Sequence, residues 1–155
     1  MLGTKGLLRP DLFDLVDYAV LLGVPVCLSP SVTPLLGAMT GRIARSGVRA
    51  VSVSLDGSRA QTHDGVRGIA GHFHMTIAAI AQLVDAGITV QVNTTVMDGN
   101  VDDLPGAAAL VARAAWSASG QPGHDVVGGA VQPVEVTHHV HAVAQFRVAW
   151  QVAAA

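Results

Sequence analysis

The chain has 155 residues, 50% hydrophobic and 13% charged, so we expect a folded unit with a hydrophobic core rather than a disordered chain. Its formal net charge of −2 gives no basic surface, which argues against nucleic acid as the main partner. Cys27 is the only cysteine, so neither a disulfide nor a multi-cysteine metal site can form within the chain.

Hydrophobic periodicity predicts four helices along the chain. The first covers about residues 10–22, and the second begins after Thr33, a residue type that often caps helices. The third covers about residues 75–86, and the fourth begins after Asn100, which we expect to cap it. Each of the first three ends at a glycine that a Val- or Ile-containing run follows directly: Gly23, Gly47 and Gly87.

The repeated order of helix, glycine and strand predicts an α/β fold with a parallel sheet. The expected strands alternate between an apolar and a polar face: residues 51–56 place Ser54 and Asp56 on the polar face, and residues 88–96 place Asn93 there. Parallel strands covered on both sides are normally apolar on both faces. We therefore interpret the polar face as the wall of an open barrel, and the alternative is an antiparallel sheet with that face in water.

Several motifs occur in a specific order around these strands. They are Leu7-Leu-Arg-Pro-Asp-Leu12, Val51-Ser-Val-Ser-Leu-Asp-Gly57, Thr62-His-Asp-Gly-Val-Arg-Gly68, Gly71-His-Phe73 and Val90-Gln-Val-Asn-Thr-Thr-Val96. In this order, about residues 7–114 resemble radical S-adenosylmethionine (radical SAM) enzymes. The closer likeness is to the branch that matures peptides or modifies haem precursors, where a Ser-Leu-Asp-Gly strand end leads into a His-Asp…Arg-Gly…Gly-x-Phe loop. We expect residues 56–73 to form this loop.

The resemblance implies a fold, a cofactor and a reaction. The fold is a partial (βα)6 TIM barrel, whose lumen holds S-adenosylmethionine beside a [4Fe-4S] cluster. In the family, the cluster reductively cleaves S-adenosylmethionine, and the 5′-deoxyadenosyl radical abstracts hydrogen from a substrate, here a peptide or a tetrapyrrole-like molecule. Such chemistry needs an enclosed site from which water is excluded.

The resemblance also implies five cofactor-binding residues. Ser54 and Asp56 would hydrogen-bond the ribose hydroxyls or the methionine end, and Arg67 would pair with the methionine carboxylate. Asn93 would meet the adenosine part, and Ser29 stands where the family often has a Thr-Asn-Gly turn.

Each of these residues also has a purely structural interpretation. Ser54 suits a crowded inner wall as a small residue, and Asp56 with the glycine after it suits a turn. Arg67 suits a solvated loop, and Asn93 suits a hydrogen bond to a neighbouring backbone group. We interpret His63 as a hydrogen-bonding residue of the loop rather than as a catalytic base.

The chain departs from the family where the cluster should bind. The Cys-x3-Cys-x2-Cys loop does not occur in this sequence, and three thiolates are needed to hold such a cluster. Cys27 lies on a later strand, and Lys5 replaces the acid of the family's Gly-Gly-Glu-Pro motif. We therefore predict no catalytic residue, no metal site and no [4Fe-4S] cluster in this chain, which should not cleave S-adenosylmethionine as it stands.

We divide the chain into a partial radical SAM core domain, residues 1–114, and a tail, residues 115–155. The tail is either a frame-shifted segment or a divergent one with strands around residues 131–136 and 139–148. Its histidines are spaced as metal ligands can be, but no cysteine completes a site, and we predict none: His124, His138, His139 and His141.

Two hypotheses about function follow. The first is a fragment of a radical SAM enzyme that keeps cofactor-wall residues without the cluster loop. The alternative is a non-catalytic α/β module that binds a nucleoside-like ligand or a protein partner. We expect self-association through an exposed sheet edge, whose backbone groups lack partners. No apolar run reaches the length of a membrane span, and the first residues do not resemble a signal peptide, so we expect a cytoplasmic chain without membrane contacts.

Overall fold

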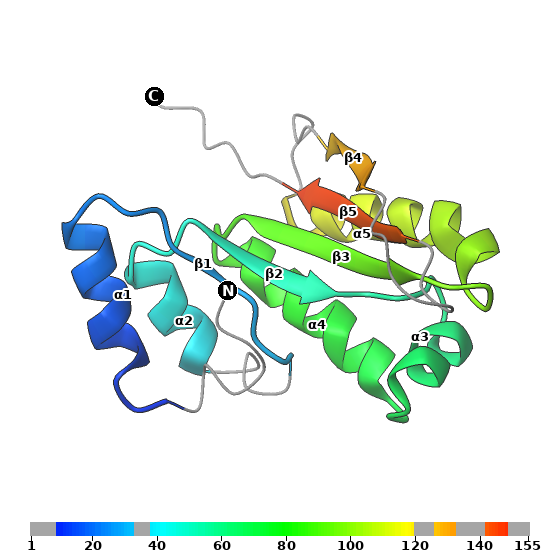
Figure 1. Cartoon of the computed structure of the whole chain (residues 1–155), viewed down its shortest axis with the longest axis horizontal. Helices are drawn as coiled ribbons and strands as arrows, with labels where there is room; N and C mark the ends of the chain where they lie inside the picture. Colours follow the sequence, from blue (N-terminus) through cyan, green and yellow to red (C-terminus); the bar gives the residue numbers. More distant parts are fainter. Residues whose placement is uncertain (1–8, 33–37, 120–125, 133–141, 149–155) are drawn as a thin grey trace.

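A five-stranded sheet organises the part of the chain that the computed structural model describes, residues 9–32, 38–119, 126–132 and 142–148 (Figure 1). The helices are α1 (Leu12–Leu21), α2 (Ala38–Arg45), α3 (Ala60–Arg67), α4 (His72–Asp85) and α5 (Leu104–Ser119), with a short 3-10 helix η3 (Val101–Asp103). The strands are β1 (Cys27–Leu28), β2 (Ala50–Ser54), β3 (Val90–Val96), β4 (Val126–Gln132) and β5 (Ala142–Val148).

The strands stand in the order β1-β2-β3-β5-β4. The first three pair in parallel, with Val51 opposite Val90 and Ser54 opposite Asn93, as the helix–strand repeat predicts. β5 pairs antiparallel with both β3 and β4, and the sequence pattern did not indicate this reversal. The α/β class and a parallel three-stranded sheet are therefore confirmed.

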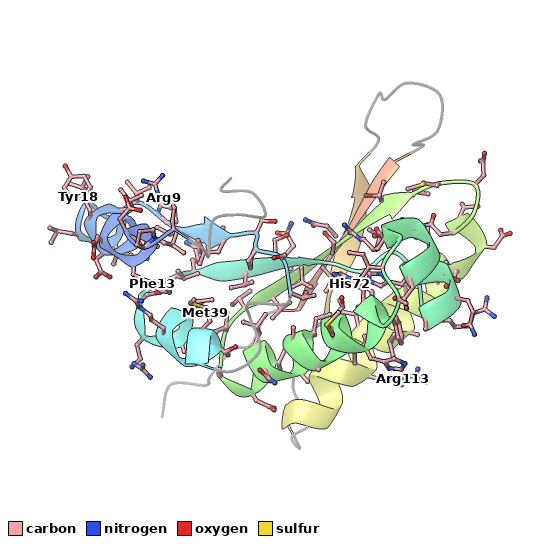
Figure 2. The ribbon with its side chains drawn as sticks, turned by 90° about the horizontal axis from the view of Figure 1, so that it is seen from below. Arg9, Phe13, Tyr18, Met39, His72 and Arg113 are labelled. Atoms are coloured by element: carbon pink, nitrogen blue, oxygen red, sulfur yellow. The ribbon has the colours of Figure 1, made fainter. Side chains whose placement is uncertain are left out.

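The two faces of the parallel strands differ as the alternation predicts. The side chains of Val51 and Val53 in β2 and of Val90 and Val92 in β3 are buried, whereas the residues between them are half-buried. α2, α4 and α5 lie on one side of the sheet (Figure 2). The buried strand residues share a hydrophobic core with side chains from α1, α2, α4 and α5, among them Leu12, Val16, Ile43, Ile80, Leu83 and Val111.

The glycines that end α1, α2 and α4 all have a positive φ, +72° at Gly23, +76° at Gly47 and +73° at Gly87. At the end of α4 the N–H of Gly87 donates to the carbonyl of Val84 over 2.9 Å, and the N–H of Ile88 donates to Leu83 over 3.0 Å. These two bonds satisfy carbonyls at the helix end and turn the chain directly toward β3. The predicted glycine junctions are confirmed.

The prediction that residues 56–73 form a loop is wrong, because they contain α3 and the start of α4. α3 buries His63 alone among its side chains and has no apolar stripe, so hydrophobic periodicity could not reveal it. The expected cap Thr33 and the four tail histidines lie outside the described residues. Across the described ranges, no helix has both the length and the apolar character that crossing a membrane requires.

We predict that Gly87→Ala lowers the free energy of unfolding by about 1–2 kcal/mol, because a Cβ is unfavourable at this φ. An added Cβ would meet no atom within 4 Å, so the change isolates backbone strain. The matched control is Gly99→Ala, which also meets open space but has no positive φ and should change stability little. Urea unfolding of both variants is the measurement, and equal stabilities would contradict the role of the left-handed junction.

Candidate functional site

Asp56 is the centre of a hydrogen-bonded cluster where β2 and β3 end. Its backbone N–H donates to Nδ1 of His63 over 2.9 Å, and its carbonyl accepts from Nδ2 of Asn100 over 3.0 Å. Its Oδ1 accepts from the backbone N–H of Thr95 over 2.9 Å, and its Oδ2 lies 2.6 Å from Nε of Arg67. The side chain of Asp56 is 1% exposed, so the carboxylate is held entirely by the protein.

The ion pair between Asp56 and Arg67 has an inner and an outer member. The Arg67 side chain remains 32% exposed, whereas the Asp56 side chain is enclosed. Oδ2 and Nε are close but not aligned as a hydrogen bond, so opposite charge is what holds them together. A buried carboxylate needs such a partner, because leaving its charge uncompensated in the interior is strongly unfavourable.

His63 is fully buried and holds the backbone of Asp56 through a hydrogen bond. Because its Nδ1 accepts from Asp56, the neutral ring carries its proton on Nε2, which lies 2.8 Å from Nδ1 of His72. Burial lowers the pKa of His63 to about 4, although the nearby carboxylate of Asp56 acts in the opposite direction. Burial also lowers the pKa of His72, and the charge of Arg67 adds to this effect.

His72 begins α4, and Figure 2 labels it at the end of the sheet near α3. The hydroxyl of Thr76 lies 3.3 Å from Nδ1 of His72 and 3.5 Å from Nε2 of His63, at the outer limit of hydrogen bonding. The ring of Phe73 meets that of His63 edge-on, with the ring centres 6.1 Å apart. These contacts hold the buried imidazole in one orientation.

Asp64 supplies the cap that α4 lacks in its own sequence. The residue before α4 is Gly71, which has no side chain for capping, and φ there is +79°. Asp64 accepts at Oδ2 from the N–H of Gly71 and at Oδ1 from the N–H of Phe73, each over 2.7 Å. Partial burial opposes ionisation, but these two hydrogen bonds outweigh it and lower the pKa of Asp64. The spacing between Asp64 and Phe73 therefore serves a structural purpose in this chain.

Asn100 stands at the N-cap position of η3, as expected, but its side chain makes no capping hydrogen bond and instead joins the ends of two strands. Its Nδ2 donates to the carbonyls of Asp56, over 3.0 Å, and Thr95, over 2.8 Å. Its Oδ1 accepts from the N–H of Met97 over 2.7 Å. Both polar atoms of the Asn100 side chain are thus engaged in the turn after β3. In the sequence, only the order Asp-Gly-Asn at this turn marked the residue.

A second carboxylate fixes the start of the segment after Asp56. Asp103 accepts at Oδ2 from the backbone N–H of Ser58 over 2.7 Å, and at Oδ1 from the hydroxyl of Ser58. Burial opposes ionisation here, but the hydrogen bonds from Ser58 outweigh it and lower the pKa of Asp103. The backbone between β2 and α3 is therefore anchored to η3, which belongs to the next βα unit.

The polar face of the sheet holds the other predicted site residues. Ser54 is registered with Asn93, and both side chains are half-buried. Asn93 donates from Nδ2 to the hydroxyl of Ser52 over 2.6 Å and accepts from Nε2 of Gln91 over 2.9 Å. Ser29 follows directly after β1, the strand next to β2. Asp56 and Arg67 form an ion pair, Ser54 and Asn93 are register partners on neighbouring strands, and Ser29 lies one strand away.

Several curated proteins are similar to about two thirds of the chain or somewhat more. The chain is 37% identical over 102 residues to the AdoMet-dependent heme synthase of Methanosarcina barkeri, a match that covers 66% of this chain and 29% of the relative. It is 37% identical over 112 residues to the mycofactocin maturase of Mycolicibacterium smegmatis, covering 72% of this chain and 28% of the relative. The chain is a partial homologue of the radical SAM enzymes.

The resemblance carried by the strand and loop motifs is thereby confirmed. A third relative is the pre-heme d1 synthase of Dinoroseobacter shibae, 34% identical over 103 residues, which are 66% of this chain and 25% of the relative. The chain thus spans between a quarter and three tenths of the length of these radical SAM relatives. No protein-family model matches it.

We predict that the free energy of unfolding decreases as the pH falls from about 6.5 to about 4. In this interval the unfolded chain protonates His63 while the folded protein keeps it neutral, so protons favour unfolding, and the contribution of His63 to this loss is complete below about pH 4. His63→Leu removes this contribution, and it also leaves the Asp56 N–H without an acceptor, at about 1–3 kcal/mol.

Urea unfolding at several pH values tests this prediction. His63→Asn should recover part of the stability at neutral pH, because its amide oxygen can stand in for Nδ1. The control is His74→Gln, which changes an exposed histidine of the following helix, α4. An unaltered pH dependence in His63→Leu would contradict the assignment.

Proposed function

We propose that this chain forms the S-adenosylmethionine-binding middle portion of a radical SAM enzyme, with β1, β2 and β3 as part of the wall of a partial (βα)6 barrel. The observation that carries the proposal is the polar sheet face that ends near the half-buried side chain of Arg67, within a segment homologous to radical SAM enzymes. In such a barrel the helices lie outside, where the apolar strand faces are, and the polar faces line the lumen.

The residues present fit S-adenosylmethionine. Hydroxyl and amide groups of Ser54 and Asn93 suit the ribose and adenine, and the guanidinium of Arg67 suits the methionine carboxylate. Ser29 would add a hydroxyl from the neighbouring strand. When bound, the cofactor supplies the adenosyl group that this family uses for hydrogen abstraction. The role of this chain is to bind and orient that cofactor against the sheet.

The residues present do not fit a [4Fe-4S] cluster. Holding one requires three thiolates with a fourth iron position open, and these 155 residues contain the single thiol of Cys27, which is exposed on β1. We therefore propose that this chain by itself does not cleave S-adenosylmethionine. For the whole enzyme we propose a peptide or tetrapyrrole-like substrate, the two kinds suggested by the names of the relatives.

A second candidate function is a non-catalytic α/β module that binds a nucleoside-like ligand or a protein partner. The same polar strand face supports this candidate, and so does the lack of cluster-binding cysteines in the sequence. The two candidates differ over the methionine part of the cofactor. A nucleoside module would bind S-adenosylmethionine and 5′-methylthioadenosine equally, whereas a radical SAM core should favour the ligand that carries a carboxylate.

We predict that the chain binds S-adenosylmethionine and that Asn93→Ala weakens this binding roughly five- to tenfold, the size expected for one neutral hydrogen bond. Isothermal titration calorimetry on the 155-residue chain is the measurement. The control is Arg113→Ala, which changes an exposed side chain of α5 (labelled in Figure 2). Unmeasurable binding by the unsubstituted chain would overturn the proposed function.

We predict that anaerobic reconstitution with iron and sulfide leaves less than one cluster per chain. The physical reason is the single thiol, which cannot supply the three ligands required. The measurement is the iron and sulfide content after desalting, with Cys27→Ser as the control. A stable stoichiometric cluster that disappears in Cys27→Ser would contradict the proposal.

A further inference from the structure

We propose that Asp56 is a positioning residue for Arg67 and does not touch the cofactor, so that Arg67 alone of the pair meets the carboxylate of S-adenosylmethionine. This inference rests on the proposed function and deepens it, because the resemblance by itself implied contact by both residues. It assigns the specificity for a carboxylate-bearing ligand to one guanidinium and the orientation of that guanidinium to a buried acid.

Exposure separates the two members of the pair. A ligand on the surface of the sheet can reach the Arg67 side chain, which is 32% exposed, but not the Asp56 side chain, which is 1% exposed. Nε of Arg67 faces Asp56, whereas the guanidinium has further N–H donors in the same plane. Those donors suit a planar carboxylate, provided that the guanidinium plane is fixed in advance.

The polar groups of Asp56 are already engaged within the protein. Oδ1 accepts from the N–H of Thr95, and Oδ2 faces Arg67. The backbone N–H and carbonyl are held by His63 and Asn100. The carboxylate oxygens could accept further hydrogen bonds, but with the side chain 1% exposed a ribose hydroxyl could reach them only if the surrounding residues moved. A buried side chain held by these contacts is suited to fixing the position of Arg67 rather than to binding a ligand.

The character of the ion pair supports the same assignment. Since Oδ2 and Nε are not aligned as a hydrogen bond, the attraction between them is mainly that of opposite charges. Asp56→Asn keeps the acceptor for the Thr95 N–H and nearly the same volume, but it removes the charge that attracts Arg67. The guanidinium should then leave its position without any direct change to a ligand contact.

A double-mutant cycle with two ligands tests the inference. S-adenosylmethionine carries the carboxylate, and 5′-methylthioadenosine has the same nucleoside without it. We expect Arg67→Gln to weaken S-adenosylmethionine binding by roughly 10- to 100-fold, the range for a hydrogen bond to a charged group. We expect Asp56→Asn to weaken it about tenfold and the double variant to bind no more weakly than Arg67→Gln. Binding of 5′-methylthioadenosine should be unchanged in all three variants.

Other outcomes would overturn the inference. Weaker binding of 5′-methylthioadenosine to Asp56→Asn but not to Arg67→Gln would mean that Asp56 contacts the ribose. Additive effects on S-adenosylmethionine would mean that the two residues act independently. If the unsubstituted chain binds neither ligand, the proposed function itself fails, and the inference fails with it. Binding of both ligands with equal affinity would instead favour the nucleoside module and remove the role of Arg67.

A measurement on the unsubstituted chain keeps the inference testable if Asp56→Asn does not fold. The carboxyl carbon resonance of Asp56 reports directly on its contacts in nuclear magnetic resonance. Addition of 5′-methylthioadenosine should leave this resonance in place, because the ligand does not reach the buried carboxylate. A clear shift of the resonance on titration, with affinity matching that from calorimetry, would show direct contact and overturn the inference.

Discussion

The burial of one carboxylate at the end of β2 is the constraint on which the site depends. Asp56 is enclosed, and an ionised group in the interior must have its charge and its lone pairs compensated. The compensation comes from Arg67 in α3 and the backbone of β3, and the asparagine of the following turn binds the main-chain carbonyl of the same residue. Three segments distant in sequence are thereby tied to one residue, which aligns the ends of the parallel strands.

The motif between β2 and α4, which contains α3, therefore serves mainly to fix the local structure. His63 holds the backbone of Asp56, and Asp64 caps α4 in place of the missing side chain of Gly71. Such hydrogen bonds are individually modest, but each would leave a buried or terminal donor unsatisfied if it were lost. In the function proposed above, contacts with the ligand are left to Arg67 and to the polar strand face, which this scaffold positions.

The strands could be predicted from the sequence because their alternation has a period of two and one face is buried, as Val51 and Val90 illustrate. α3 could not, because His63 is its one buried side chain and no apolar stripe exists. The brace formed by Asn100 could not, because its contact with Asp56 spans 44 residues of sequence. The pairing of Arg67 with Asp56 could not be predicted either, because it forms only when α3 packs against the end of β2. Which of the two side chains is the more exposed likewise depends on that packing.

The antiparallel β5 bears on how a barrel can be built from this sheet. Its pairing runs from Val90 opposite Val148 to Val96 opposite Ala142, so it occupies the length of the outer edge of β3. A partial (βα)6 barrel needs a further parallel strand at one edge or the other, and none can pair with β3 while β5 stays there. In the described sheet the other edge belongs to β1, of which two residues pair with β2. The parallel part of this sheet can therefore be extended only by a strand that pairs with β1, the strand that Ser29 follows.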